Sequence, residues 1–149
     1  MYGNILIATD GSERAGKGVA AGLDLARASG AKVTIVTVSE PFPVYDLGTS
    51  MGLFKDQAAI DRYDAGCRAA AQAVLSGAAE AATAAGVPCE TLHVENAAPA
   101  RAILDAAGAR SCDLIVLTSH GRQGIERFLL GSQSSRVVQS AEISVLVVR

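Results

Sequence analysis

Residues 113–136 hold the chain's strongest candidates for chemistry. An apolar run at residues 114–117 has the length and the β-branched content of a buried strand, and a polar loop is expected to follow it. Ser132 then precedes valines at helical spacing and is a candidate helix N-cap, with Gly131 allowing a tight turn in front of it. The stretch therefore predicts a strand, a loop and a helix in that order.

This order of elements predicts an anion site. A helix N-terminus exposes unpaired N–H groups and carries roughly half a positive charge, which favours phosphate. Hydroxyl donors, glycines and cationic side chains surround the expected N-terminus: Ser132, Ser134, Ser135, Gly121, Gly131, Arg122, Arg127 and Arg136. The alternative is a solvated loop followed by an ordinary capped helix, because serine is a common cap.

The spacing of these residues resembles that of the universal stress protein family. Its nucleotide-binding members carry Gly, two residues, Gly, nine residues, Gly and then Ser or Thr after the fourth strand. Here Thr118 stands at the first position, Gly121 at the second, and Gly131 and Ser132 at the third and fourth. Thr118 departs from the pattern where the family's backbone passes close to the ribose. Weakened or lost nucleotide binding is therefore the alternative to a nucleotide site.

The resemblance extends over nearly the whole chain, with similar segments at residues 5–12, 94–99 and 143–149. It implies one domain over residues 1–149 and the adenine nucleotide alpha hydrolase-like fold. In that fold a five-stranded parallel sheet in the order 3-2-1-4-5 is doubly wound by helices. We therefore expect an α/β protein of this class.

The resemblance also implies which residues contact ATP. From adenosine to the γ-phosphate, they are Ala8, Thr9, Asp10, Val38, Thr118, Gly121, Gly131, Ser132, Gln133 and Ser134. The first three and the backbone of Val38 belong to adenosine, the next two to the ribose and α-phosphate, and the last four to the β- and γ-phosphates. Asp10 has an alternative role as a turn or cap residue. Mg²⁺ or Mn²⁺ is expected with the triphosphate, although no carboxylate cluster is dedicated to a metal.

Composition favours one core built from small aliphatic residues. Of 149 residues, 50% are hydrophobic but only 4% are aromatic and none is Trp, which fits helices laid closely on a parallel sheet. The 13 basic and 15 acidic residues are spread along the chain and give a net charge of −2. Because nucleic-acid binding calls for a basic patch, we expect no nucleic-acid partner.

The cysteines and the apolar segments indicate the cellular compartment in which the protein is expected. Cys67, Cys89 and Cys112 lack Cys-x-x-Cys spacing and are expected to be reduced, small apolar fillers. The chain opens on a strand without the basic and apolar regions of a signal peptide, and it has no apolar run of about 18 residues. We therefore expect a cytoplasmic protein without a membrane span.

The apolar periodicity alternates between strand and helix along the chain. Strands are expected at residues 4–9, 33–38, 90–94, 114–117 and 143–148, and helices at residues 12–29, 56–85, from Pro99 and from Ser132. Kinks are expected near Gly66 or Gly77. Alternation of this kind predicts a doubly wound sheet. Ligands then bind where the strand order reverses, which in the order implied by the resemblance lies between the first and fourth strands, terminated by Asp10 and Thr118. The loop at residues 39–55 is a candidate ligand cover or partner-binding flap.

Three other chemistries are weaker interpretations. Residues 11–18 nearly match a P-loop, but Gly18 stands where the motif needs a hydroxyl and the helical period begins inside the would-be loop. A phosphoryl-accepting receiver needs an acidic pair after the first strand, and here Asp10 stands alone. Flavin binding lacks an aromatic residue in the loop at residues 118–127. His93 is expected to be a packed or hydrogen-bonded strand residue.

The resemblance predicts a binding protein more than an enzyme. His120 is a candidate general base for slow ATP hydrolysis, and its alternatives are a phosphate contact or exposure to solvent. The favoured function is an ATP-binding stress-response module whose occupancy changes how it meets an unidentified protein partner. The alternative is a homodimeric interaction protein that binds no nucleotide. The apolar edge strand from Ile143 to Val148 invites pairing with another chain, and the resemblance implies that it pairs antiparallel with a second copy.

Overall fold

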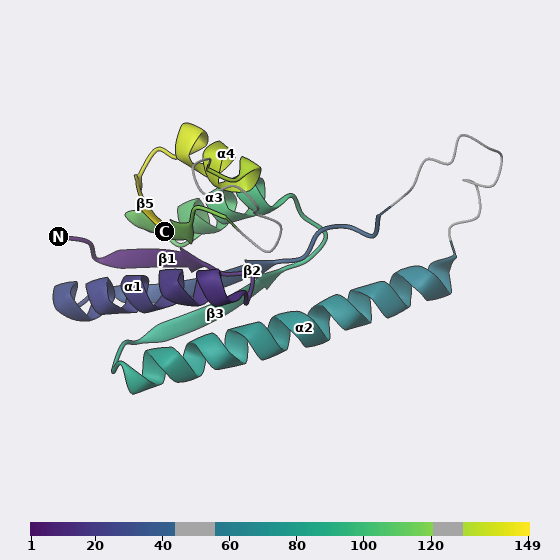
Figure 1. Ribbon diagram of the computed structural model, residues 1–149, viewed down its shortest axis with the longest axis horizontal. Coiled ribbons are helices and arrows are strands. Elements are labelled where there is room, and N and C mark those ends of the chain that lie inside the picture. The colour runs from purple at the N-terminus through teal and green to yellow at the C-terminus, as the bar shows by residue number, and fades with distance from the viewer. Residues whose placement is uncertain (44–55, 121–129) are drawn as a thin grey trace.

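The computed structural model describes residues 1–43, 56–120 and 130–149 and arranges them as a sheet with a layer of helices on each face (Figure 1). The strands are β1 (Asn4–Ala8), β2 (Lys32–Val38), β3 (Cys89–Val94), β4 (Leu114–Thr118) and β5 (Ser144–Val148). The helices are α1 (Glu13–Ser29), α2 (Gln57–Ala84), α3 (Pro99–Ala109) and α4 (Ser132–Ser140). Each strand boundary lies within one residue of its predicted place.

The five strands form one parallel sheet in the order β3-β2-β1-β4-β5, which confirms the predicted topology. β1 lies at the centre, and Ile5, Leu6 and Ile7 are fully buried because helices cover both faces. Receiver and flavodoxin-type sheets have the order 2-1-3-4-5. The observed order therefore excludes the receiver fold, and it reverses between β1 and β4 as expected.

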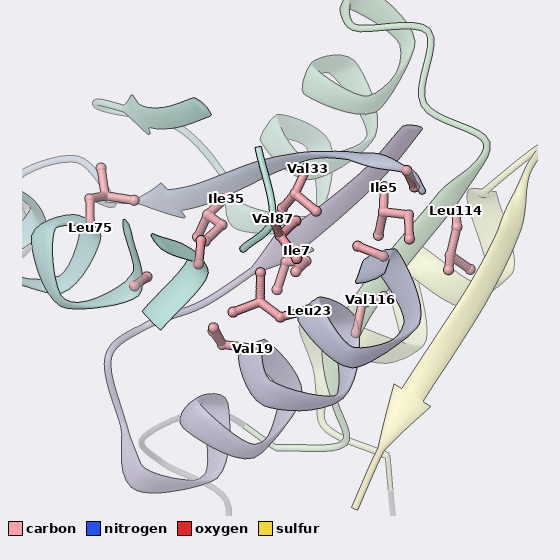
Figure 2. Close-up of a cluster of buried hydrophobic side chains, with 14 residues drawn as sticks. Ile5, Ile7, Val19, Leu23, Val33, Ile35, Leu75, Val87, Leu114 and Val116 are labelled. Carbon is pink, nitrogen blue, oxygen red and sulfur yellow. The ribbon is translucent and has the colours of Figure 1, made fainter. Parts of the chain in front are cut away.

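Two apolar cores lie on opposite faces of the sheet. Figure 2 shows the core under α1 and α2, which contains Ile5 and Ile7 of the sheet and Leu23 and Leu75 of the helices. Leu6 points the other way and packs in the core under α3 and α4. This alternation follows from the period of two in a strand, and it fixes which strand residues reach each layer.

The ends of α1 follow from local sequence. The hydroxyl of Ser12 accepts a hydrogen bond of 3.1 Å from the backbone N–H of Ala15, and Gly30 ends the helix in the left-handed conformation at φ 70°. Lys17 lies exposed within this helix. The P-loop interpretation is therefore wrong, because the would-be phosphate loop is already helical.

α2 is one continuous helix that runs through both Gly66 and Gly77. The carboxylate of Asp56 caps it by accepting from the N–H groups of Ala58 and Ala59 at 3.1 and 3.3 Å. The helix does not break at either glycine. Most of the predicted flap, residues 44–55, lies outside the described residues.

The cysteines are free and sit mainly as small apolar residues. Cys112 is buried in the core under α3 and α4, and Cys89 packs against the other core. Burial raises the pKa of both thiols, which disfavours the reactive thiolate. In the described part of the chain, we find no helix with both the length and the hydropathy to cross a bilayer.

Candidate functional site

A cavity of about 720 Å³ opens at the carboxyl ends of β1, β2 and β4. It lies where the strand order reverses, and the N-terminal turns of α3 and α4 and one face of α2 complete its walls. Its volume falls within the roughly 300–1,000 Å³ typical of small-molecule sites. The cavity is therefore where the fold would hold a ligand.

Nine of the ten predicted contact residues line this cavity. They are Ala8, Thr9, Asp10, Val38, Thr118, Gly131, Ser132, Gln133 and Ser134. The tenth, Gly121, lies outside the described residues, as do Arg122 and Arg127. Pairing of β1 with β4 brings together segments that are more than a hundred residues apart in sequence. Their convergence was predicted, whereas their contact with a nucleotide stays a prediction.

The N-cap of α4 is Gly131, so the prediction of Ser132 as the cap is wrong. The carbonyl of Gly131 accepts the first helical hydrogen bond, from the N–H of Ser135 at 2.8 Å, and Ser132 is already the first helical residue. Gly131 has an ordinary negative φ of −57°. Its glycine identity matters because a Cβ there would lie 3.1 Å from the carbonyl oxygen of Ser119. Close approach of the loop, rather than a special turn, requires it.

Two of the predicted phosphate ligands have side chains engaged elsewhere. The hydroxyl of Ser134 donates to the carbonyl of Thr118 at 2.8 Å. The side-chain carbonyl of Gln133 accepts from the N–H of Ala100 at 3.1 Å and so caps α3. What remains for an anion is the set of backbone N–H groups in the first turn of α4, together with the hydroxyl of Ser132.

The side chain of Thr118, which replaces the motif glycine, is held by the protein. Its hydroxyl donates to the carbonyl of His120 at 3.1 Å. Its methyl group faces α1, where a Cβ on Gly18 would lie only 2.9 Å from it. Gly18 of α1 therefore makes the space that the Thr118 side chain occupies.

Asp10 serves the turn after β1 and also lines the cavity. Its Oδ1 accepts from the backbone N–H of Ser12 at 2.9 Å, the local role that was its alternative. Because Ser12 in turn caps α1, this carboxylate fixes the path from β1 into the helix. The two roles are compatible, since the same turn forms one wall of the cavity.

His120 is a cavity residue that the predicted contact set omitted. It is only 8% exposed, so exposure to solvent, one of its alternatives, is wrong. Its Nδ1 lies 3.3 Å from the hydroxyl of Ser119, and no carboxylate of the described residues contacts the ring. The polar run that follows β4 was the signal in the sequence that pointed to it.

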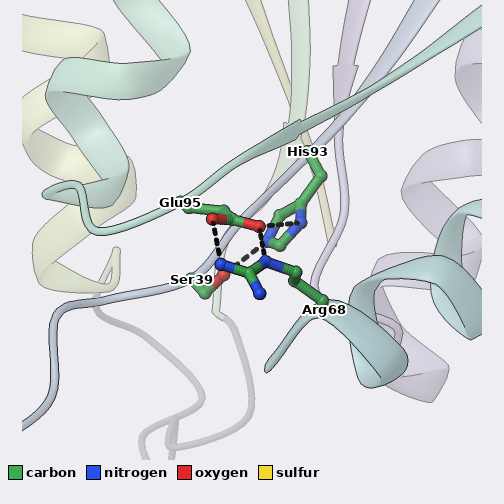
Figure 3. A network of polar contacts seen from close by, with 4 residues as sticks. All are labelled: Ser39, Arg68, His93 and Glu95. Atoms are coloured by element: carbon green, nitrogen blue, oxygen red, sulfur yellow. Dashed lines mark hydrogen bonds and ion pairs between the residues drawn. The ribbon is translucent and has the colours of Figure 1, made fainter. Parts of the chain in front are cut away.

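A polar network joins the ends of β2 and β3 to α2 at the rim of the cavity (Figure 3). The hydroxyl of Ser39 is hydrogen-bonded to Nε2 of His93, and Arg68 donates to Glu95 at 2.6 Å. The hydrogen bond from Arg68 lowers the pKa of Glu95. His93 is thus a hydrogen-bonded strand residue, as predicted.

The same network has the connectivity of a Ser-His-acid triad but not its geometry. Nδ1 of His93 lies 3.7 Å from Oε1 of Glu95, beyond hydrogen-bonding range, and that carboxylate is paired with Arg68. Ser39 lines the cavity, so its hydrogen bond to His93 helps to hold this part of the cavity rim in place. The network explains how α2 is held across the ends of β2 and β3.

The described cavity wall carries more negative than positive side chains. Asp10 and Glu40 contribute carboxylates, and no Lys or Arg of the described residues lines it. Nor do the residues that the structure describes include a group of three or more His, Cys, Asp or Glu side chains placed to hold a metal. Anion binding in this part of the site therefore depends on backbone dipoles and hydroxyl groups.

Comparison with known proteins defines the family. The model of the universal stress protein family matches residues 1–149. A universal stress protein of Thermus aquaticus, encoded in the QAH/OAS sulfhydrylase 3′ region, is 38% identical over the full length of both chains. The chain therefore belongs to the universal stress protein family.

Solved structures of the family share this fold. A universal stress protein in complex with cAMP has a TM-score of 0.69 at 28% identity, over 99% of this chain and 97% of that one. One from Archaeoglobus fulgidus in complex with dAMP has a TM-score of 0.67 at 23% identity, over 99% and 98%. The second supports the fold alone.

Proposed function

We propose that this protein is an adenine-nucleotide-binding stress-response module in which residues 1–149 act as one domain. The observation that carries the proposal is the cavity of about 720 Å³, which gathers nine predicted contact residues at the reversal of strand order. The complex of a related protein with cAMP supports the same class of ligand. ATP is the nucleotide that the motif favours, and a cytoplasmic location fits the reduced cysteines.

The arrangement of α4 supports phosphate binding by backbone groups. Ser132, Gln133 and Ser134 form its first turn, where N–H groups have no partner within the helix. All three residues line the cavity, which would place these groups and the hydroxyl of Ser132 near a bound phosphate. Mg²⁺ or Mn²⁺ would be held chiefly by the phosphates and water, since Mg²⁺ sites of this kind use only one or two carboxylates.

Occupancy is proposed to act through a protein partner, with at most slow hydrolysis of ATP. His120 lies in the cavity, but no carboxylate of the described residues orients its ring as a general base would require. The rim network of Ser39, His93, Glu95 and Arg68 places α2 at the cavity mouth. A ligand that contacts this wall would change the surface that α2 presents.

A homodimer without nucleotide is the second candidate function, and the sheet edge favours the dimer. β5 lies at the edge of the sheet, and Leu146 in it is 38% exposed. An apolar edge strand offers unpaired backbone groups to a second copy. A homodimer is compatible with both the nucleotide-binding function and this second candidate. Only the second candidate requires that no nucleotide binds.

The test of nucleotide binding is calorimetric titration with ATP and Mg²⁺ after copurifying nucleotide has been extracted and identified by mass. We expect an adenine nucleotide in the extract or micromolar affinity for added ATP. Gly131→Ala should weaken binding about tenfold, because a Cβ 3.1 Å from the carbonyl of Ser119 displaces the start of α4. Gly108→Ala is the matched control, since a Cβ there meets nothing within 4 Å. An empty extract with no heat at millimolar ATP would leave the dimer as the functional unit.

A further inference from the structure

His120 contributes an imidazole to the cavity wall that the predicted contacts do not use. The residue is more than nine-tenths buried and lines the cavity. Nδ1 is placed by Ser119, and Nε2 has no hydrogen-bond partner among the described residues. The ring forms part of the cavity wall, and Nδ1 is the nitrogen that Ser119 engages.

The same edge of the ring lies against the start of α4. Cδ2, which is bonded to Nε2, lies 3.8 Å from the position that a Cβ on Gly131 would take. Gly131 is the N-cap, so this edge of the imidazole lies next to the start of this nine-residue helix. A phosphate bound by those groups would come within reach of the imidazole.

We propose that His120 donates a hydrogen bond from Nε2 to the ligand's phosphate, and that protonation of its imidazole strengthens nucleotide binding. This inference rests on the proposed function and makes that site pH-dependent. Because no Lys or Arg of the described residues lines the cavity, the imidazolium is the positive side chain that this wall can supply. Imidazole changes charge between about pH 5 and 8, so affinity rises as the pH falls through that range.

Among the described residues, four other titratable groups line the cavity and also affect how nucleotide binding depends on pH. They are Asp10 after β1, Glu40 after β2, and Tyr63 and Cys67 on α2. The two carboxylates favour the imidazolium and oppose the phosphate. α3 and α4 contribute no titratable side chain to the described lining. The direction of the pH dependence alone therefore does not identify the titrating residue. Variants are needed to assign it.

Titration with cAMP isolates the protein's contribution, because a cyclic phosphodiester keeps one negative charge throughout this range. We expect the affinity of the wild type for cAMP to rise about tenfold between pH 8 and pH 5.5, since a charge-assisted hydrogen bond is roughly twice as strong as a neutral one. Adenosine lacks the phosphate, so its affinity should not change with pH. Equal pH dependence for adenosine and cAMP would overturn the proposal.

The two histidines of the chain provide a matched pair of variants. His120→Gln keeps a neutral donor and should bind cAMP with the wild-type affinity of pH 8 at every pH. His93→Gln removes the imidazole of the rim network and should keep the pH dependence. In Glu40→Gln, the affinity for cAMP should still rise as the pH falls. Persistence of the full tenfold change in a folded His120→Gln variant would contradict the assignment.

Imidazole NMR of the wild type gives a readout that needs no variant of the buried residue. Addition of cAMP at pH 5.5 should shift the ring resonances of His120 and leave those of His93 in place. Unchanged resonances of both rings at saturating cAMP would overturn the inference while nucleotide binding stands. If neither ATP nor cAMP binds between pH 5.5 and 8, the proposed function fails, and this inference fails with it.

Discussion

At the scale of single residues, the departure of Thr118 from the nucleotide-binding motif is matched by Gly18 on α1. The Thr118 methyl group occupies space that a Cβ on Gly18 would enter at 2.9 Å, and the Thr118 hydroxyl donates to the carbonyl of His120. The segment at residues 11–18, which nearly matches a P-loop, thus contains a glycine that is required for close packing of α1 against β4. A glycine that looks like part of a phosphate loop in sequence is explained here by helix–sheet contact.

Gly18→Ala and Gly16→Ala should change stability in opposite directions. Both positions lie in α1, where alanine is favoured over glycine by about 0.5–1 kcal/mol. At Gly16 a Cβ meets nothing within 4 Å, so that gain should appear in the free energy of unfolding measured with urea. At Gly18 the clash of the new Cβ with Thr118 should outweigh this gain and lower the free energy of unfolding by about 1–3 kcal/mol.

The pair can be checked by removing the methyl group from the other side. Thr118→Ser keeps the hydroxyl that donates to His120 but deletes Cγ2. The double variant Gly18→Ala, Thr118→Ser should therefore recover most of the stability lost in Gly18→Ala. Additive effects of the two substitutions would mean that the two side chains do not compete for the same space.

Thr118→Gly should leave nucleotide affinity within about threefold of the wild type, because the threonine side chain is held by α1 and the loop. Calorimetric titration with ATP checks this. A large gain in affinity on substitution would instead support the candidate function without nucleotide, in which Thr118 blocks the site. The backbone of Thr118 is unchanged in either case, since its carbonyl still accepts from Ser134.

At the scale of elements, Gln133 ties the N-terminus of α4 to that of α3. Ala98, the N-cap of α3, provides no side-chain acceptor, and the side chain of Gln133 supplies one to Ala100. Both helix ends face the cavity. One residue therefore carries a structural hydrogen bond and a predicted ligand contact, through different groups.

Substitutions of Gln133 should separate stability from binding. Gln133→Ala removes the cap of α3 and should lower the free energy of unfolding by about 1 kcal/mol. Gln133→Glu keeps an acceptor and places a negative charge at two helix N-termini, so stability should be kept or raised. The same charge repels phosphate, and affinity for ATP should fall about tenfold or more. Stability is measured by urea unfolding and affinity by calorimetric titration. A Gln133→Glu variant that lost stability but kept its affinity for ATP would contradict the prediction.

Asp113 joins the start of β1 to the turn before β4. Its carboxylate accepts from the N–H groups of Gly3 and Asn4 at 2.7 and 3.1 Å. Partial desolvation acts to raise the pKa of Asp113, but these hydrogen bonds outweigh it and hold the pKa below its ordinary value. A lowered folded pKa means that the stabilisation is present above the unfolded pKa and is lost as the pH falls through the folded pKa.

Asp113→Ala should therefore lower the free energy of unfolding by about 1–2 kcal/mol at pH 7, the contribution of two hydrogen bonds. The difference from the wild type should shrink below about pH 4, where the aspartate of the unfolded chain becomes protonated. Asp105→Ala is the control, because its i,i+4 pair with Arg101 is exposed to solvent and contributes little to stability. A pH-independent deficit in Asp113→Ala would show that the carboxylate charge is not involved.

Sequence predicted the elements well because apolar periodicity and caps are local. Ser12, Gly30 and Pro99 mark helix ends through interactions within a few residues of themselves. The convergence of Asp10 and Thr118 was predictable once strand order was given by family resemblance. The cap of α3 by Gln133 was not, because the two residues of that hydrogen bond are 33 positions apart. The burial of His120 likewise depends on packing of the loop against α4.

At the scale of the whole molecule, the two edges of the sheet differ in chemistry. β3 forms one edge and carries Glu90, which pairs with Arg110, and Thr91 is exposed beside it. β5 forms the other edge and has only Ser144 as a polar residue. Charged side chains on an edge strand discourage pairing with another chain, whereas a bare apolar edge invites it. This asymmetry favours β5 as the dimer edge.

Leu146→Lys should convert a dimer into a monomer. Leu146 is 38% exposed on β5, and a lysine in its place would put a positive charge on both strands of the expected antiparallel pair. Sedimentation at micromolar concentration should give a dimer for the wild type and a monomer for the variant. Thr91→Lys on β3 is the matched control and should remain a dimer. A wild-type monomer would contradict the assembly, and because the cavity lies at the strand ends rather than at this edge, nucleotide affinity should be the same in both assembly states.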